Sequence, residues 1–318
     1  AKSIVQVRMQ GGFSAMVEHN AYNLMNSQEQ MYFEELVYPE MTYLGPKAEE
    51  WLAKKRWVIE NDFNFDWKKF AYRSDAPVVG ADASITGSAN GINYYISAGY
   101  LDTEGIAPRS NSTRYSFRTN VDAQVKPWLK VGSNLNLSYS EYSQTETGWT
   151  VTSVDGLAYA QPTYNAPYEI IYNEDGSFKE FGEELKYFDT AHDFPSDDMI
   201  NPFYYYSIYP SGGNDISLAG SLYEEIKPFE GFTLKAVQAL DGYVARGSAM
   251  ILPSYERQNG ERVMNGQRAE SYSRYYQLTS TNTAEYKFSI DDLHNWVFLA
   301  GHESIVKQSE GFGVGIEG

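Results

Sequence analysis

Histidine, which often catalyses reactions or binds metals, occurs only four times in this chain, and cysteine does not occur. The absence of cysteine excludes a thiolate metal site and a thiol nucleophile. The four histidines, His19, His192, His294 and His302, have no metal-ligand spacing, and Glu303 follows His302 in a strand-like segment where neighbouring side chains diverge. We therefore expect no catalytic residues, no metal centre and no cofactor.

Acidic side chains cluster at two places in residues 142–215. The segment "NEDGS" (173–177) resembles half of a calcium loop, but Asp175-Gly176 between two hydrophobic runs favours a hairpin tip. A second cluster contains Asp189, Asp193, Asp197 and Asp198. Neither cluster has the full ligand order of an EF-hand, so a structural calcium ion in these loops is only an alternative.

Aromatic residues are abundant, at 15% of the chain with 27 tyrosines. Flat rings stack on sugar rings, and tyrosine hydroxyl groups can hydrogen-bond to them. The same rings could instead pack the long segment 142–215 on itself or on a partner. For ligand contact we select Trp149, Tyr159, Tyr164, Tyr204 and Tyr205.

Residues 112–125 alternate between polar and apolar side chains, as a strand with two different faces does. Residues 129–141 alternate in the same way. In a soluble sheet the apolar face would meet a core, whereas in a membrane barrel it would meet lipid and the polar face would line the lumen. The predicted lumen-facing residues are Arg114, Arg118, Asn120, Asp122, Asn134 and Asn136, and the predicted lipid-facing residues are Tyr115, Phe117, Val121, Leu135 and Leu137.

The connections between the expected strands decide between these two environments. Strands are expected at 4–9, 13–23, 81–88, 91–101, 112–125, 129–141, 216–226, 232–242, 268–288 and 295–308. Tight turns such as "SANG" and "KPW" alternate along the chain with long connections at 102–111, 142–215 and 243–267. A barrel with short periplasmic turns and long extracellular loops accounts for this pattern. Trp128 and Trp296, beside tight turns, would then join an interfacial aromatic girdle.

Two segments in the first long connection (24–80) have helical character. Residues 25–38 begin with Asn26 and Ser27 followed by Glu29, which is typical of a capped helix, and residues 45–62 place apolar side chains at helical spacing after Pro46. The net charge of −17 lacks the basic excess that nucleic-acid binding needs, so we expect no nucleic-acid partner.

Residues 65–140 resemble the start of the barrel in SusC/RagA-type TonB-dependent outer-membrane transporters. The matching pieces include Asp66-Trp67, "ITGS" (85–88), "YISAGYL" (95–101), "RYS" (114–116), "RTN" (118–120) and "WLKVG" (128–132). "LMNSQEQMYF" (24–33) and "LHNWVFLAGHESI" (293–305) are similar to further pieces of the family. The family's full chain is longer, with a barrel of about 22 strands.

The resemblance implies an all-β fold, an antiparallel transmembrane barrel of which this chain supplies about nine strands and short helices in an extracellular loop. Residues 1–12 could be the end of the plug domain, and residues 13–318 would be the N-terminal part of the barrel. It further implies import of oligosaccharides across the outer membrane of a Gram-negative bacterium. A SusD-like lipoprotein lid and the TonB-ExbB-ExbD complex would be partners, and the resemblance allows a dimer of such pairs.

Three alternatives remain open from the sequence. The RagA branch of the family transports oligopeptides. Outside the family, a soluble all-β carbohydrate-binding module or a β-rich glycoside hydrolase would also contain many aromatic and acidic side chains. Detergent-free purification would favour the module, and cleavage of a glycan would favour the hydrolase.

Overall fold

A single antiparallel sheet of nine strands dominates the computed structural model, in the order β1-β2-β3-β4-β5-β6-β7-β10-β11. The structure describes residues 3–15, 24–37, 48–66, 73–107, 109–145, 167–168, 210–253, 256–258, 261–263, 265–291 and 293–318. The strands of the sheet are β1 (Ile4–Ser14), β2 (Ala76–Ala89), β3 (Ile92–Glu104), β4 (Asn111–Lys126), β5 (Leu129–Thr145), β6 (Pro210–Ile226), β7 (Phe232–Ile251), β10 (Gln267–Ile290) and β11 (His294–Glu317). The predicted all-β antiparallel fold is therefore confirmed.

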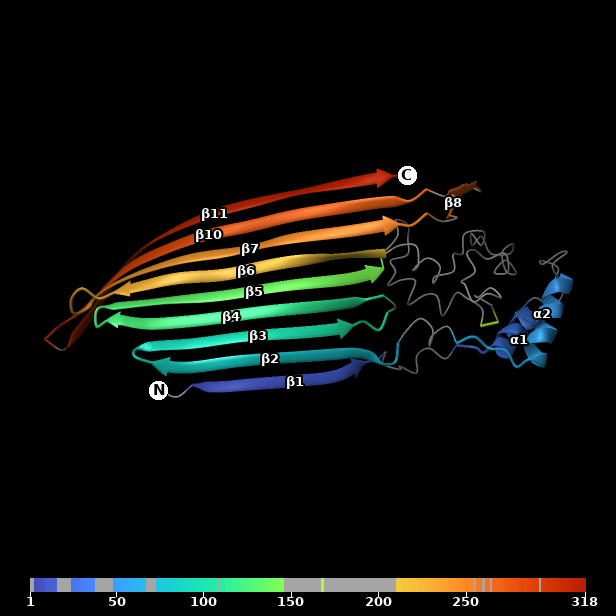
Figure 1. Ribbon diagram of the computed structural model, residues 1–318, viewed down its shortest axis with the longest axis horizontal. Helices are drawn as coiled ribbons and strands as arrows, with labels where there is room; N and C mark the ends of the chain where they lie inside the picture. The colour runs from blue at the N-terminus through green and yellow to red at the C-terminus, as the bar shows by residue number, and fades with distance from the viewer. Residues whose placement is uncertain are drawn as a thin grey trace.

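The connections sort to the two ends of the sheet, as the sequence predicted. Figure 1 shows the β2–β3, β4–β5, β6–β7 and β10–β11 turns at the left, and at the right the helices and the strand ends that the long connections join. In the β2–β3 turn, Asn90 has φ 51° and Gly91 has φ 79°. Positive φ at both positions is what a two-residue hairpin needs, and Asn-Gly supplies it with the least strain.

The strands reach further toward the long connections than the sequence indicated. β6 begins at Pro210 and so includes "SGGND" (211–215), which we expected to be a loop, while β7 continues to Ile251. A small hairpin, β8 (Glu256–Gln258) with β9 (Glu261–Val263), lies in the predicted loop 243–267. Pairing with a neighbouring strand satisfies backbone hydrogen-bonding groups whatever the side chains are. Strands can therefore extend beyond the residues whose side chains alternate between polar and apolar.

The start of the chain also differs from our expectation of two strands separated by Gly11-Gly12. β1 runs through both glycines without interruption and pairs with β2 along its whole length. Glycine tolerates an extended backbone, so it need not end a strand. Most of residues 1–12, considered above as the end of a plug domain, lie in β1, and their assignment to a plug domain stays a prediction.

Two short helices lie beyond the long-connection end of the sheet (Figure 1), as predicted. α1 (Ser27–Val37) begins with a reciprocal cap, in which Glu29 N donates to Asn26 Oδ1 and Asn26 N donates to Glu29 Oε2, both at 2.9 Å. α2 (Ala48–Glu60) packs against it, and Met31 and Val58 are fully buried. No helix in the described part is long and apolar enough to cross a membrane.

The described part of the sheet has no packed layer on either face. Large apolar side chains on it are exposed, among them Val7, Phe117, Leu222, Leu299 and Phe312. A sheet with one apolar face buries that face against a second layer or against lipid. The sheet alone therefore needs an apolar environment on one side.

Candidate functional site

The predicted lumen-facing residues lie together on one face of the sheet, which we call the polar face. Arg118 is paired with Ser97 and Asn136, and Asn120 is paired with Tyr95 and Asn134. Directly paired residues share a face, so the six predicted residues form a continuous surface over β4 and β5. Whether that face lines a lumen stays a prediction.

The middle of the polar face is lined by amide and hydroxyl groups. Asn134 Nδ2 donates to Ser221 Oγ at 3.3 Å, and the hydroxyl groups of Ser138 and Ser217 are 2.6 Å apart. The Arg118 guanidinium lies 5.9 Å from the centre of the Tyr95 ring, within cation–π distance. This part of the polar face presents uncharged hydrogen-bonding groups and one positive charge, that of Arg118, to a ligand in contact with it.

A charged network lies on the same face, closer to the short turns. The Tyr223 hydroxyl donates to Asp122, and the Lys130 Nζ is 4.0 Å from Asp122 Oδ1. The amino groups of Lys130 and Lys235 lie 5.6 and 5.7 Å from the centre of the Tyr223 ring. Each of the four strands β4 to β7 thus contributes one side chain to a network centred on Tyr223.

Gly132 makes room for this tyrosine. A Cβ atom at position 132 would lie 2.6 Å from Tyr223 Cζ and 2.7 Å from Asp122 Oδ1, much closer than van der Waals contact. Gly132 and Tyr223 are directly paired, so the ring lies across the glycine backbone. A ring covering a glycine in the neighbouring strand is a known way of packing a sheet.

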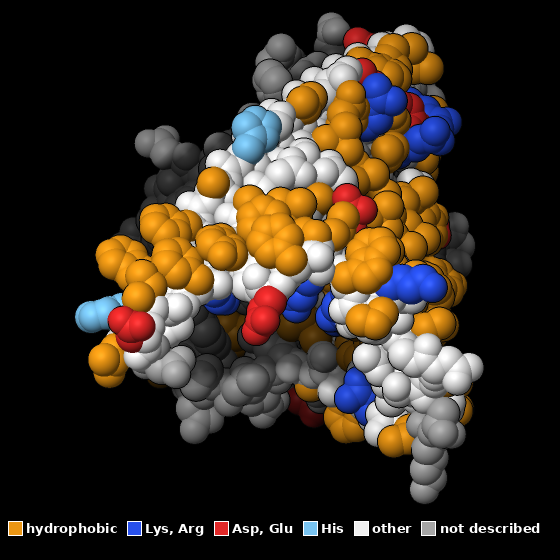
Figure 2. Space-filling model, turned by 90° about the vertical axis from the view of Figure 1, so that its left-hand side faces the viewer, with side chains coloured by type: hydrophobic (Ala, Val, Ile, Leu, Met, Phe, Trp, Pro, Cys, Tyr) orange, Lys and Arg blue, Asp and Glu red, His pale blue; other side chains and the backbone are white. Residues whose placement is uncertain are grey.

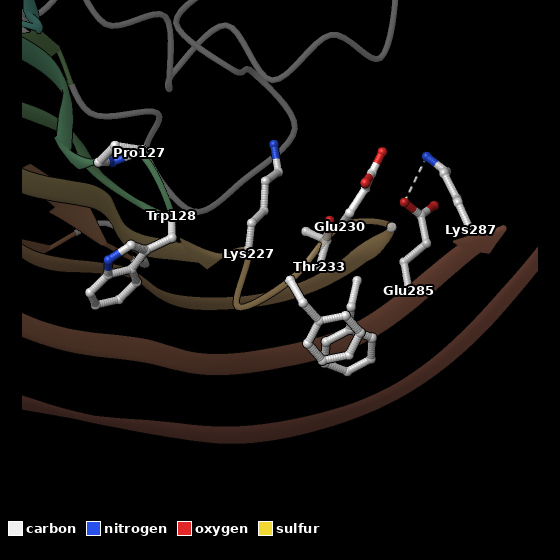
Figure 3. Close-up of a pocket in the computed structure, with 10 residues that line it drawn as sticks. Pro127, Trp128, Lys227, Glu230, Thr233, Glu285 and Lys287 are labelled. Atoms are coloured by element: carbon white, nitrogen blue, oxygen red, sulfur yellow. Dashed lines mark ion pairs between the residues drawn. The ribbon is translucent and has the colours of Figure 1, made fainter.

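A cleft of about 550 Å³ lies at the short-turn end, between the β4–β5 and β6–β7 turns. Figure 3 shows Lys227, Glu230 and the Glu285–Lys287 ion pair projecting from the concave side of the curved sheet. Lys287 Nζ is 2.7 Å from Glu285 Oε1, and Lys227 Nζ is 2.8 Å from Glu225 Oε1. The charges of these two ion pairs neutralise each other, and the residues that line the cleft contain no arrangement of nucleophile and base.

The opposite face, called the apolar face, contains the predicted lipid-facing residues. Tyr115 lies between Tyr100 and Tyr139, with ring centres 5.3 and 6.3 Å apart, and Phe117 is paired with Ala98 and Leu137. Aromatic pairs of this kind contribute roughly 0.5–1.5 kcal/mol beyond their burial. Exposure of this face to lipid remains a prediction.

A second group of aromatic residues gathers near the short turns. Trp296 stacks on Phe298, which stacks on Phe288, while Phe229, Phe232 and Tyr286 form a neighbouring cluster. Figure 2 looks onto this end and shows hydrophobic side chains over much of the surface. Trp128 and Trp296 are about half exposed there, at 50% and 51%, where an interfacial girdle was predicted.

Among the described residues, α1 contacts the long segment 142–215 at Tyr168. The Tyr168 hydroxyl donates to the Glu34 carboxylate, 3.0 and 3.1 Å from its two oxygens, and Gln30 Nε2 donates to Glu34 Oε1 at 2.7 Å. Glu34 is 4% exposed and Tyr168 is fully buried. A buried carboxylate held by several donors fixes the position of Tyr168 relative to α1.

The proposed ligand-contacting residues Trp149, Tyr159, Tyr164, Tyr204 and Tyr205 lie outside the described residues. The same holds for the two acidic clusters that could hold calcium. Within the described residues, no group of histidine, aspartate and glutamate side chains is arranged to hold a metal ion.

Comparisons with known proteins agree with the fold and with part of the sequence. No family model matches the chain. TonB-dependent receptor P26 of Formosa agariphila is 35% identical over 120 residues, which are 38% of this chain and 11% of the receptor. TonB-dependent receptor P3 of the same organism is 26% identical over 121 residues, 38% of this chain and 12% of the receptor.

Solved structures match the whole chain. The RagAB peptide transporter has a TM-score of 0.74 at 23% identity, and its "closed-closed" state has a TM-score of 0.71 at the same identity. Each match covers 100% of this chain and 36% of the solved chain. At this identity the structural match is evidence for the barrel fold alone.

Part of the chain is similar in sequence to TonB-dependent receptors, and the structural matches agree with it in fold. The motifs of the chain resemble the SusC/RagA type, and these matches agree with that resemblance. The chain spans about a third of the length of the solved chains that it matches, 36%. The names of these relatives describe receptors and importers and not enzymes, which agrees with the expectation from the sequence.

Two features of the described part were missed by the sequence reasoning. The network around Tyr223 joins strands that are distant in the sequence, and only the register of β5 with β6 reveals it. Polar residues on the apolar face of β7, β10 and β11 were also overlooked, although the interruption of the alternation by Gln238, Asn282 and His302 is visible in the sequence.

Proposed function

We propose that this chain forms part of an active importer of oligosaccharides in the outer membrane of a Gram-negative bacterium. The observation that carries the proposal is the two-faced antiparallel sheet with short turns at one end and long connections at the other. This arrangement suits a barrel whose polar face lines a passage and whose long loops face the cell exterior. The chain acts as the wall of a conduit, and no bond in the cargo is broken.

The proposed partners follow from the transport class. A SusD-like lipoprotein would cover the extracellular end as a lid, and the TonB-ExbB-ExbD complex would supply energy from the periplasmic side. Glycan as cargo is supported by the aromatic residues of the long segment, Trp149, Tyr159, Tyr164, Tyr204 and Tyr205, and by the amide and hydroxyl groups in the middle of the polar face.

Oligopeptide import is the second candidate. The solved structures with this fold are described as a peptide importer, and the match covers the whole of this chain. A peptide backbone would use the same amide and hydroxyl groups of the polar face as a glycan would. The two cargoes therefore have to be separated by experiment.

Uptake by cells tests the cargo. A strain lacking the full-length protein is complemented with the unaltered protein, and uptake of fluorescent oligosaccharides and oligopeptides is compared with and without a protonophore. We expect oligosaccharide uptake that the protonophore abolishes. Peptide uptake alone would reverse the choice of cargo, and uptake that survives the protonophore would refute TonB dependence.

Loop variants test the aromatic residues. Trp149→Ala combined with Tyr204→Ala in the full-length protein should reduce oligosaccharide uptake at least tenfold, while Trp128→Phe at the opposite end of the sheet should leave it unchanged. Equal uptake by both variants would show that the loop aromatics do not contact cargo. Recovery of the protein from washed cells without detergent would instead favour a soluble carbohydrate-binding module.

A further inference from the structure

Two stacked tyrosines lie on the polar face, one on β7 and one on β10. Tyr243 and Tyr275 are directly paired, and their ring centres are 5.8 Å apart with an angle of 29° between the ring planes. Tyr243 is paired on its other side with Ser217, and Ser217 is paired with Ser138. Ser138 and Asn136 are two residues apart on β5, so the rings share the face of the predicted lumen-facing residues.

The neighbouring ring covers one face of Tyr243 and leaves the other open. Tyr275 is fixed on its own side, because its hydroxyl donates to Gln277 Oε1 at 3.0 Å. The other face of Tyr243 is turned toward β6, where the paired side chain of Ser217 is small. The Tyr243 residue is accordingly 43% exposed. The polar face thus presents one flat aromatic surface that is supported from behind.

Small hydroxyl side chains lie in front of this aromatic surface. Ser116, Ser138 and Ser217 are successive partners on β4, β5 and β6, and the hydroxyl groups of Ser138 and Ser217 are 2.6 Å apart. Neighbouring strands are about 4.8 Å apart, so the three serines extend roughly 10 Å sideways from Ser217. A flat ring that stacks on Tyr243 therefore has room above serine hydroxyl groups.

Two carboxylates lie on either side of this space. Asp241 is two residues from Tyr243 on β7, and Asp215 is two residues from Ser217 on β6. Because the strands are antiparallel, the two aspartates lie in opposite directions from the Ser217–Tyr243 pair, each about 7 Å along a strand. Within the described residues, neither carboxylate has a hydrogen-bond or ion-pair partner.

Carboxylates nearer the short turns are used within the protein. Asp122 accepts a hydrogen bond from Tyr223, and Glu225 and Glu285 each form an ion pair with a lysine. The aspartates beside Tyr243 differ from these three carboxylates. An ionised carboxylate only accepts hydrogen bonds, so a ligand that binds between the two aspartates has to supply donors.

Basic side chains of the polar face lie further from the aromatic surface. Arg114 and Arg118 are on β4, three strand spacings from Tyr243, which is roughly 14 Å. The Arg118 guanidinium is in addition close to the ring of Tyr95, on the β3 side. The charge beside Tyr243 is therefore negative.

The tyrosine pair lies closer to the long connections than the charged network around Tyr223 does. On β5, Ser138 marks the level of Tyr243, whereas Gly132 marks the level of Tyr223. β5 begins beside a short turn at Leu129 and ends at Thr145, where a long connection begins. Cargo that enters from the long-connection end therefore reaches Tyr243 before it reaches the network.

We propose that Asp215, Ser217, Asp241, Tyr243 and Tyr275, here called the Tyr243 site, bind one uncharged sugar residue of an oligosaccharide. The apolar face of the sugar ring stacks on Tyr243, and hydroxyl groups at opposite edges of that ring donate to the two carboxylates. An acidic sugar would place a third negative charge between them and is disfavoured. This inference rests on the proposed importer function and narrows its cargo to uncharged glycans.

Protection of an engineered cysteine tests occupancy of the site directly. Ser217→Cys is made in a cysteine-free form of the full-length protein, and its labelling by a water-soluble maleimide is followed in outer membranes. A mixture of malto-, cello-, xylo- and laminari-oligosaccharides should slow the labelling severalfold, whereas oligogalacturonides should not. The control is Ser309→Cys, which is paired with Tyr275 behind the two rings and should be labelled at an unchanged rate.

Uptake by cells tests the roles of the ring and of the carboxylates. Tyr243→Ala should reduce uptake of the uncharged oligosaccharides about fivefold, as loss of one aromatic stacking contact predicts. Tyr243→Phe keeps the ring and should retain most of the uptake. Asp215→Asn combined with Asp241→Asn should lower the ratio of uncharged to acidic oligosaccharide uptake severalfold, while Glu303→Gln, nearer the short turns, should not change it.

The outcomes separate failure of the site from failure of the proposed function. Uptake of no oligosaccharide by the unaltered protein would refute the importer function on which the site rests. Uptake of uncharged oligosaccharides without protection at position 217 would overturn the Tyr243 site alone, even where Tyr243→Ala is too unstable to assay. Preferential uptake of oligogalacturonides by the unaltered protein would overturn the assignment to uncharged sugars.

Discussion

Single residues control how closely neighbouring strands pack on the polar face. Tyr223 hydrogen-bonds to Asp122, two strands away, only because its ring passes over Gly132. No comparable need exists at Gly11, where an added Cβ would meet nothing within 4 Å. The two glycines therefore differ although both lie in strands.

Gly132→Ala should destabilise the barrel by about 1–3 kcal/mol, because the methyl group would displace the Tyr223 ring and break its hydrogen bond to Asp122. Gly11→Ala should be close to neutral. The temperature at which the purified full-length protein loses its heat-modifiable mobility in gel electrophoresis measures both effects. Equal temperatures for the two variants would contradict this packing.

The buried carboxylate of Glu34 depends on donors from two segments. Tyr168→Phe removes one of these donors from a group that is almost fully buried, at a cost of about 1–3 kcal/mol to the local contact. We expect faster cleavage of segment 142–215 by a protease added to intact cells. Tyr32→Phe, at a side chain that is 61% exposed, is the control and should leave the cleavage rate unchanged.

Whole strands have two faces because side chains alternate, and β4 is the clearest example. Phe117 and Arg118 are adjacent in the sequence but are predicted to meet lipid and a wet lumen, respectively. Spin labels at these positions should respond differently: oxygen, which concentrates in lipid, should relax position 117 more, and a water-soluble nickel chelate should relax position 118 more. A reversed or equal response would show that the faces were assigned wrongly.

Much of the fold could be predicted from local sequence signals. The hairpin at Asn90-Gly91, the cap at Asn26 and the alternation of β4 are encoded in neighbouring residues. The continuation of β1 through Gly11-Gly12 could not be predicted in this way, because it is fixed by pairing with β2, far along the chain. The charged network around Tyr223 was missed for the same reason, since it depends on which strands become neighbours.

The whole sheet is open within the described residues, since β1 and β11 each pair with a strand on one side only. An open edge in lipid leaves backbone donors and acceptors unsatisfied, so a membrane barrel must close. We expect residues 1–318 produced alone to give no heat-modifiable barrel in detergent, while the full-length protein does. A stable, heat-modifiable form of the isolated segment would show that these strands close on their own.

The unbroken pairing of long strands also has a mechanical consequence. β10 and β11 are paired along 24 residues each, and the described pairings of the nine-stranded sheet shift register once, between Gln124 and Lys126. A pulling force directed roughly along the strands would load these rows of hydrogen bonds in shear, so that many bonds must break at once. The nine-stranded sheet can therefore resist tension along its strands, while less extensively paired parts of the protein yield first.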